Sequence, residues 1–211
     1  MKKAAAVLLL ALTGSMLFGC GGKNTGSSGF HPESSSIYVT GDGRVSSALV
    51  EAYEKDNYDE NSLKTYLDSE ISRYGEANEG QGDSAPVSLK ECTVKNGKMT
   101  AVFEYASPED MIKFAEAQQD DSMSLTSLEV KNAVDALSGG DVSDGTFFNA
   151  KKEAVKLDDV RKENEAKAVI ASGEGLIRTE GKILFVSEGV ELDSAKNTAK
   201  VTGETSYIIF K

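Results

Sequence analysis

The chain is poor in the residues that carry most catalytic and metal-binding chemistry, with two cysteines and one histidine among 211 residues. The histidine, His31, precedes the predicted domain, which excludes a Ser-His-Asp or Cys-His arrangement and a histidine-based zinc site within that domain. Basic residues are also scarce: 23 Lys and Arg against 34 Asp and Glu give a net charge of −11. Without a basic stripe, no counterion release drives phosphate binding, so nucleic acid is excluded as a partner.

Long hydrophobic runs are rare, and the longest is at the N-terminus. It covers residues 4–18 and follows Lys2 and Lys3, which is the arrangement of a secretory signal. This run is shorter than the roughly 20 residues that cross a bilayer as a helix, and no later segment approaches that length. We therefore expect no permanent transmembrane helix.

The signal ends in Leu17, Phe18, Gly19 and Cys20, which resembles the lipobox of bacterial lipoproteins. The resemblance implies a diacylglycerol on the Cys20 thiol, cleavage just before Cys20, and a protein held at the extracytoplasmic face of the cell membrane. Two acyl chains are enough for stable anchoring. Phe18 is bulkier than the residue usual at its position, and the alternative is an ordinary secretory signal with an incidental cysteine.

Three regions follow from this interpretation. Residues 1–19 are a lipoprotein signal peptide, residues 20–36 are the lipidated cysteine with a Gly/Ser-rich tether, and residues 37–211 are a single globular domain. Sixteen tether residues span a root-mean-square distance of roughly 20 to 24 Å. Cleavage removes two lysines and no acid, so the formal charge falls from −11 to −13.

Two hairpins are indicated near the start of the domain. Asp42-Gly43 separates extended runs, and Asn96-Gly97 favours a two-residue turn that sets the register of its strands. The pairs predicted for the core face of the second hairpin are Val94 with Met99, Cys92 with Ala101, and Lys90 with Phe103.

Two helices have recognisable starts. Asp59 is a plausible N-cap for an apolar stripe that runs from Leu63 to Tyr74, and Ser107 caps a helix with Pro108 at its first position. A third, short helix from Val130 is predicted to stop at residues 139–140. The rest is mostly extended, which predicts an α+β fold: a mainly antiparallel sheet with two or three helices packed on one face, preceded by a cleaved signal and a flexible tether.

Four blocks of the domain carry a resemblance to a known family. They are Ile37-Tyr38-Val39 with Gly41-Asp42-Gly43, Tyr58-Asp59-Glu60 with Leu63-Lys64, residues 181–187, and Tyr207-Ile208-Ile209. These blocks resemble uncharacterised surface lipoproteins of Gram-positive anaerobes. The resemblance implies location and a similar fold, and it supplies no activity. Residues 120–143 depart from the family pattern, so no binding residues are carried over.

The remaining candidates for chemistry are weak. Cys92 is expected to be buried among apolar neighbours, protonated and inert. The acidic segments 56–61 and 139–145 carry oxygen ligands, but neither matches a calcium-binding loop, and a solvated turn or helix cap is the favoured interpretation. We expect no catalytic residue, metal or cofactor.

The sequence therefore predicts a membrane-anchored extracytoplasmic lipoprotein that acts as a non-enzymatic binding or interaction module at the cell envelope. Its contact with the membrane is the lipid on Cys20, and its protein or small-molecule partner is not specified. Two alternatives stay open. One is a carboxylate-based envelope hydrolase, and the other is a small transporter-associated solute-binding lipoprotein with two lobes.

Overall fold

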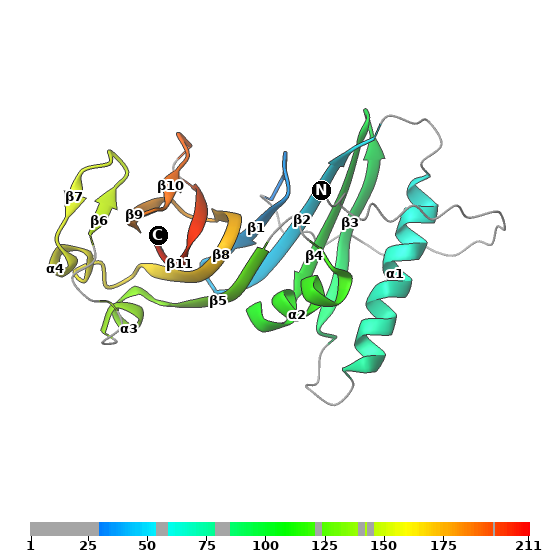
Figure 1. Ribbon diagram of the computed structural model, residues 1–211, viewed down its shortest axis with the longest axis horizontal. Coiled ribbons are helices and arrows are strands. Elements are labelled where there is room, and N and C mark those ends of the chain that lie inside the picture. The colour runs from blue at the N-terminus through cyan, green and yellow to red at the C-terminus, as the bar shows by residue number, and fades with distance from the viewer. Residues whose placement is uncertain are drawn as a thin grey trace, which may run out of the picture.

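A computed structural model describes residues 30–53, 59–78, 85–120, 124–138, 142, 146–195 and 197–211. Within these ranges the chain forms one large sheet with four helices packed on it (Figure 1). The predicted signal peptide, Cys20 and most of the predicted tether lie outside the described residues.

The chain divides at residue 120 into two halves of the same sheet. The N-terminal half contains β1 (Ser36–Val39), β2 (Val45–Ala52), α1 (Glu60–Ala77), β3 (Val87–Lys95), β4 (Lys98–Tyr105) and α2 (Pro108–Gln118). The C-terminal half contains β5 (Ser124–Asn132), α3 (Ala133–Ser138), β6 (Phe147–Asn149), β7 (Ala154–Val155), α4 (Leu157–Val160), β8 (Lys167–Thr179), β9 (Ile183–Ser187), β10 (Glu191–Leu192) and β11 (Thr198–Phe210).

The two halves meet at β8, the long strand in the middle of the sheet. The strand order is β3-β4-β2-β1-β8-β11-β9-β6-β7, with β5 also beside β8 and β10 beside β11. β1 runs parallel to β8, and the other described pairings are antiparallel. The predicted α+β class with a mainly antiparallel sheet is therefore confirmed.

The helices cover both faces of the sheet, which corrects the prediction of two or three helices on one face. α1 and α2 pack on the face that carries Val169, whereas α3 and α4 pack on the face that carries its neighbour Ala168. Successive side chains of a strand point to opposite faces. Because Ala168 and Val169 are both fully buried, each face of β8 needs a cover of its own.

We call the side of β1–β4 under α1 and α2 the helix face. Its side chains belong to the main hydrophobic core, where the ring of Phe114 from α2 contacts the rings of Tyr74, Phe103 and Tyr105 at centroid distances of 5.2, 5.6 and 6.1 Å. This core continues into the C-terminal half through β8 and β11. A single core therefore joins the halves.

Residues 30–35, which we call the strap, cover the opposite side of β1–β4, the strap face. Phe30 is 4% exposed and its ring stacks on Tyr38 at 4.8 Å, over Ala48 and Val102. The Ser35 hydroxyl accepts a hydrogen bond from the Val50 N–H at 3.0 Å.

The strap is also held through its carbonyl groups. The His31 carbonyl accepts from Arg178 Nη1 at 3.4 Å, and the Glu33 carbonyl lies 3.5 Å from Lys98 Nζ. Residues 30–35, which the sequence assigned to the tether, therefore contact the sheet through one aromatic ring and these hydrogen bonds.

The second hairpin has the predicted turn and pairing up to Cys92 with Ala101. Beyond that point a β-bulge at Lys90 shifts the register, so that Leu89 and not Lys90 pairs with Phe103. The bulge gives the core face an apolar residue and lets Lys90 pair with Glu104 at 2.5 Å. A bulge is defined by one extra residue in one of the two strands. At an edge strand such as β3, it also discourages pairing with a strand of another molecule.

Candidate functional site

A small hollow lies between α1 and the sheet. Its volume is about 40 Å³, which leaves room for a few heavy atoms. Its walls are almost entirely apolar, and the one charged residue that borders it, Glu51, contributes chiefly the hydrocarbon part of its side chain. The lining residues are Leu63 and Leu67 from α1, Leu49 and Glu51 from β2, and Met99 and Ala101 from β4.

The hollow exists because α1 is fixed to the sheet at both of its ends. Asp59 caps the first turn through its carboxylate, which accepts from the Ser62 N–H at 2.8 Å, as predicted. Glu60 then reaches the free edge of β3 and accepts from the Val94 N–H at 3.0 Å. At the other end Tyr74 packs edge-on against Phe114. Between these attachments, Leu63 and Leu67 do not fill the space over β2 and β4.

Cys92 lies on the same face of β3, opposite Ala101. It is half-buried and not fully buried as expected. Burial, with a smaller contribution from the Glu60 carboxylate, raises the pKa of the Cys92 thiol to about 11. The thiol is therefore protonated at neutral pH and a weak nucleophile, in agreement with the interpretation of an inert cysteine.

Two hydroxyl groups are buried together nearby. The oxygens of Ser47 and Tyr105 lie 2.7 Å apart, and burial raises the pKa of Tyr105. Each hydroxyl satisfies the other, as buried polar groups require. We assign this pair a structural role, because the two hydroxyls are bonded to each other within the core.

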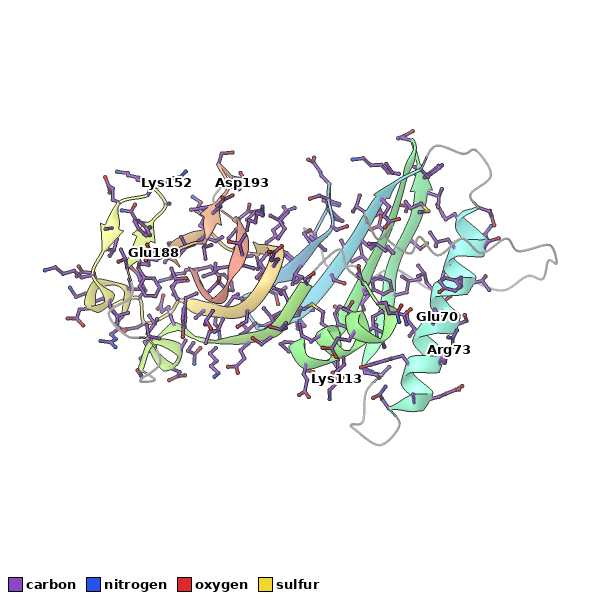
Figure 2. The ribbon with its side chains drawn as sticks, in the orientation of Figure 1. Glu70, Arg73, Lys113, Lys152, Glu188 and Asp193 are labelled. Carbon is purple, nitrogen blue, oxygen red and sulfur yellow. The ribbon has the colours of Figure 1, made fainter. Side chains whose placement is uncertain are left out.

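The charged groups of the two helices pair along their own helix and do not converge on the hollow. Glu70, 7% exposed, pairs with Arg73 one turn later, and Glu109 contacts Lys113 at 2.7 Å. Figure 2 shows Glu70 and Arg73 on α1 and Lys113 on α2. Together α1 and α2 carry seven acidic and three basic side chains, so the helix face presents an acidic outer surface.

Most of the residues singled out from the sequence lie away from this hollow or outside the described residues. Leu17, Phe18, Gly19 and Cys20 are outside them, as are residues 56–58 of the first acidic segment and all of 139–145 except Val142. In the described ranges, no group of three or more His, Cys, Asp or Glu side chains could hold a metal ion. His31 is exposed and uses its backbone carbonyl, not its ring, to bind Arg178.

The sequence identified four of the six residues that line the hollow. Leu63 and Leu67 belong to the predicted helix stripe, and Met99 and Ala101 were placed on the core face of the second hairpin. Leu49 and Glu51 were missed as lining residues, because the pairing of β2 with β4 joins segments about fifty residues apart. The alternation of Leu49, Val50 and Glu51 along the strand was the one signal in the sequence that could have placed Leu49 and Glu51 on the same face.

The described helices offer no membrane span: none is both long and apolar enough to cross a bilayer. Comparison with known proteins gives no family either, since no family model, no curated protein and no solved structure matches the chain. The class defined by the fold and the hollow is thus an α+β domain with an apolar recess beneath one helix. Any function has to be argued from these features.

Proposed function

We propose that the protein is a lipid-anchored lipoprotein of the cell envelope, whose domain is a non-enzymatic binding module. The anchor is a diacylglycerol on Cys20, exposed as the mature N-terminus by cleavage after Gly19. The ligand-contacting surface is the hollow under α1. The observation that carries the binding role is this hollow, because it is a concave apolar surface bordered by a charged residue, Glu51, and such surfaces are where ligands bind.

The chemistry of the hollow favours recognition over catalysis. Its size suits a short aliphatic side chain, and Glu51 suits a neighbouring positive charge on the same ligand. The titratable group next to it, Cys92, is held in its protonated form. A peptide segment with an aliphatic residue beside a basic one is therefore the ligand chemistry that fits best.

The two alternatives gain no specific support. A glycosidase needs two carboxylates facing each other across a bound substrate, whereas Glu70, the most buried acid of the described residues, pairs with Arg73. A two-lobed solute-binding protein needs two cores that move about a hinge, whereas one core crosses both halves of this sheet.

Mass spectrometry of the mature N-terminus tests the anchor. We expect a protein that begins at Cys20 and carries the mass of a diacylglycerol, and a Cys20→Ala variant that is released from the membrane fraction. An unmodified Cys20, or a mature chain that begins elsewhere, would contradict the anchor and leave a secreted domain.

Site-specific photo-crosslinking in cells tests the binding role. A photoreactive residue in place of Leu67 should give a discrete crosslinked product that Glu51→Gln weakens, whereas the same residue in place of the exposed Ser69 should not. If purified mature protein instead turns over an envelope substrate, and one carboxylate variant abolishes that turnover, the binding role is wrong and the hydrolase alternative is right.

A further inference from the structure

We propose that the strap face of β1–β4 is the surface that rests against an anionic lipid bilayer, with the helix face and its hollow turned away from it. This inference rests on the lipid anchor of the proposed function. It adds an orientation to that anchor, and the orientation follows from where the tether joins the domain and how charge is distributed over the two faces.

The tether joins the domain on the strap face. Phe30 is seated between Tyr38 and the side chains of Ala48 and Val102, so the chain leaves the domain there and not at a mobile end. Nine residues separate Cys20 from Phe30. Ten peptide steps reach at most roughly 33 to 36 Å, and the root-mean-square span of so short a Gly/Ser-rich chain is roughly 16 to 19 Å.

This reach is short compared with the size of the domain. A helix with its side chains is about 10 to 12 Å across, so α1 and α2 place the outer surface of the helix face well behind the sheet. Turning the helix face toward the bilayer would require the tether to pass around the sheet and these helices. With the strap face toward the bilayer, the tether takes its shortest path.

The strap fixes the face of the domain at which the tether begins. Phe30 is anchored by ring stacking, Ser35 is bonded to Val50, and Arg178 bonds the strap carbonyl of His31. Arg178 belongs to β8 and Val50 to β2, so the strap is tied to two different strands. These contacts keep the start of the tether on the strap face, and its short reach then favours that face toward the bilayer.

The charges of the two faces reinforce this orientation. By the alternation of side chains, β1–β4 and the adjoining part of β8 carry more basic than acidic residues on the strap face, and Glu33 of the strap adds one further acid. The residues are Lys90, Lys95, Lys98 and Arg178 against Glu91 and Glu104. The helix face carries seven acids and three bases. Anionic headgroups within a Debye length therefore repel the helix face more strongly.

The orientation connects the anchor to the hollow. Glu51 and the other lining residues are on the helix face, so they point away from the bilayer and toward the extracellular or wall side. A ligand can then reach the hollow without passing between the domain and the lipid.

Energy transfer to the bilayer tests the orientation. The lipidated full-length protein is reconstituted in vesicles of phosphatidylcholine and phosphatidylglycerol that contain a headgroup acceptor dye. A donor dye is attached in a Cys92→Ala background to Ala52→Cys on the strap face or to Ala117→Cys on α2. Both positions are exposed alanines, so the two variants are matched.

We expect the transfer efficiency from position 52 to be at least about twofold that from position 117, because roughly one helix diameter or more separates the two sites along the membrane normal. Phe30→Ala should bring the ratio toward one while the protein stays bound, and Ser35→Ala should lower it by a smaller amount. A ratio of one or below in the vesicle-bound wild-type background, or a ratio that neither strap variant changes, would overturn the orientation.

The anchor and the orientation fail in different ways. If Cys20 is not lipidated, the protein does not float with the vesicles and the dye also labels the free Cys20 thiol. If the anchor is present and the orientation is wrong, the protein floats and the two positions give equal transfer.

Discussion

The two faces of β1–β4 are covered by very different amounts of chain. On the helix face, α1 and α2 build an aromatic cluster around Phe114 that is continuous with the core of the whole sheet. On the strap face, six residues seal a patch around Tyr38 and Ala48 with one ring, Phe30, and a few backbone contacts.

This difference separates two tasks within the same sheet. The helix face contributes the larger part of the stability, because burial of apolar surface is the main stabilising term. The strap face contributes less stability, and under the proposed anchoring it fixes the point at which the tether joins the domain. Substitutions on the two faces should therefore differ in both size and character.

The largest effect is expected from Phe114→Ala on the helix face. Loss of a ring that touches three other aromatic rings leaves a cavity, and the free energy of unfolding should fall by about 3 to 5 kcal/mol. Urea unfolding followed by circular dichroism measures this. Val134→Ala, at an exposed position, is the control and should change the free energy by about 0.5 kcal/mol or less. Equal losses of unfolding free energy in Phe114→Ala and Val134→Ala would contradict the conclusion that the helix face contributes the larger part of the stability.

Phe30→Ala on the strap face should cost less, about 1 to 3 kcal/mol. The ring is as well buried as that of Phe114, but the strap can detach without opening the main core, as terminal segments often do. Limited proteolysis should show earlier cleavage within residues 30–35 while the rest of the domain stays intact. A loss as large as that of Phe114→Ala would mean that the two faces form one cooperative unit.

The next effect, about 1 kcal/mol, is expected from Ser107→Ala at the start of α2. The Ser107 hydroxyl accepts from the Asp110 N–H at 3.1 Å and donates to its carboxylate at 2.6 Å. Ser72→Ala, on the exposed middle of α1, is the matched control and should leave the unfolding midpoint in urea nearly unchanged. If Ser72→Ala destabilised the protein more than Ser107→Ala, capping by Ser107 would not be what holds α2 on the helix face.

The smallest effect on stability is expected at Cys92, which is half-buried at the margin of the helix face. Its chemistry gives the sharper test. With the pKa of the thiol raised to about 11, alkylation in a Cys20→Ser background should be slow at pH 7 and should accelerate up to about pH 11, since only the thiolate reacts. A rate that levels off near pH 9 would show an ordinary, solvated thiol.

Local signals in the sequence identified much of the helix face. The Asn96-Gly97 turn set the register of the second hairpin, and Asp59 and Ser107 marked the starts of α1 and α2. The register prediction was wrong only beyond the bulge at Lys90, because a bulge depends on the burial of its neighbours and has no turn residue to announce it.

Long-range pairing explains what the sequence did not predict. β5 was missed, and Val130 was assigned to a helix, because Ser124–Asn132 becomes a strand only by pairing with β8. Gly173 lies within β8. Its φ is +100°, and a Cβ there would lie 2.1 Å from the Ser124 carbonyl oxygen, so the close approach of β5 requires glycine.

The strap was hidden by its composition. Phe30 is one aromatic residue in a stretch of Gly and Ser that favours a flexible tether. Its partners Tyr38, Ala48 and Val102 come together only when β1, β2 and β4 are assembled. The same holds for the candidate site. Its lining residues on α1 could be predicted from the helix stripe, whereas those on β2 could not.

Hydrogen exchange at two backbone amides tests the contrast between the faces most directly. The Val50 N–H is held by Ser35 of the strap, and the Val94 N–H by Glu60 of α1. Both amides should be protected in the wild-type protein. In Phe30→Ala, Val50 should exchange much faster while Val94 keeps its protection. Unprotected Val50 in the wild type, or equal acceleration of both amides in the variant, would contradict a strap that seals one face independently of the helices.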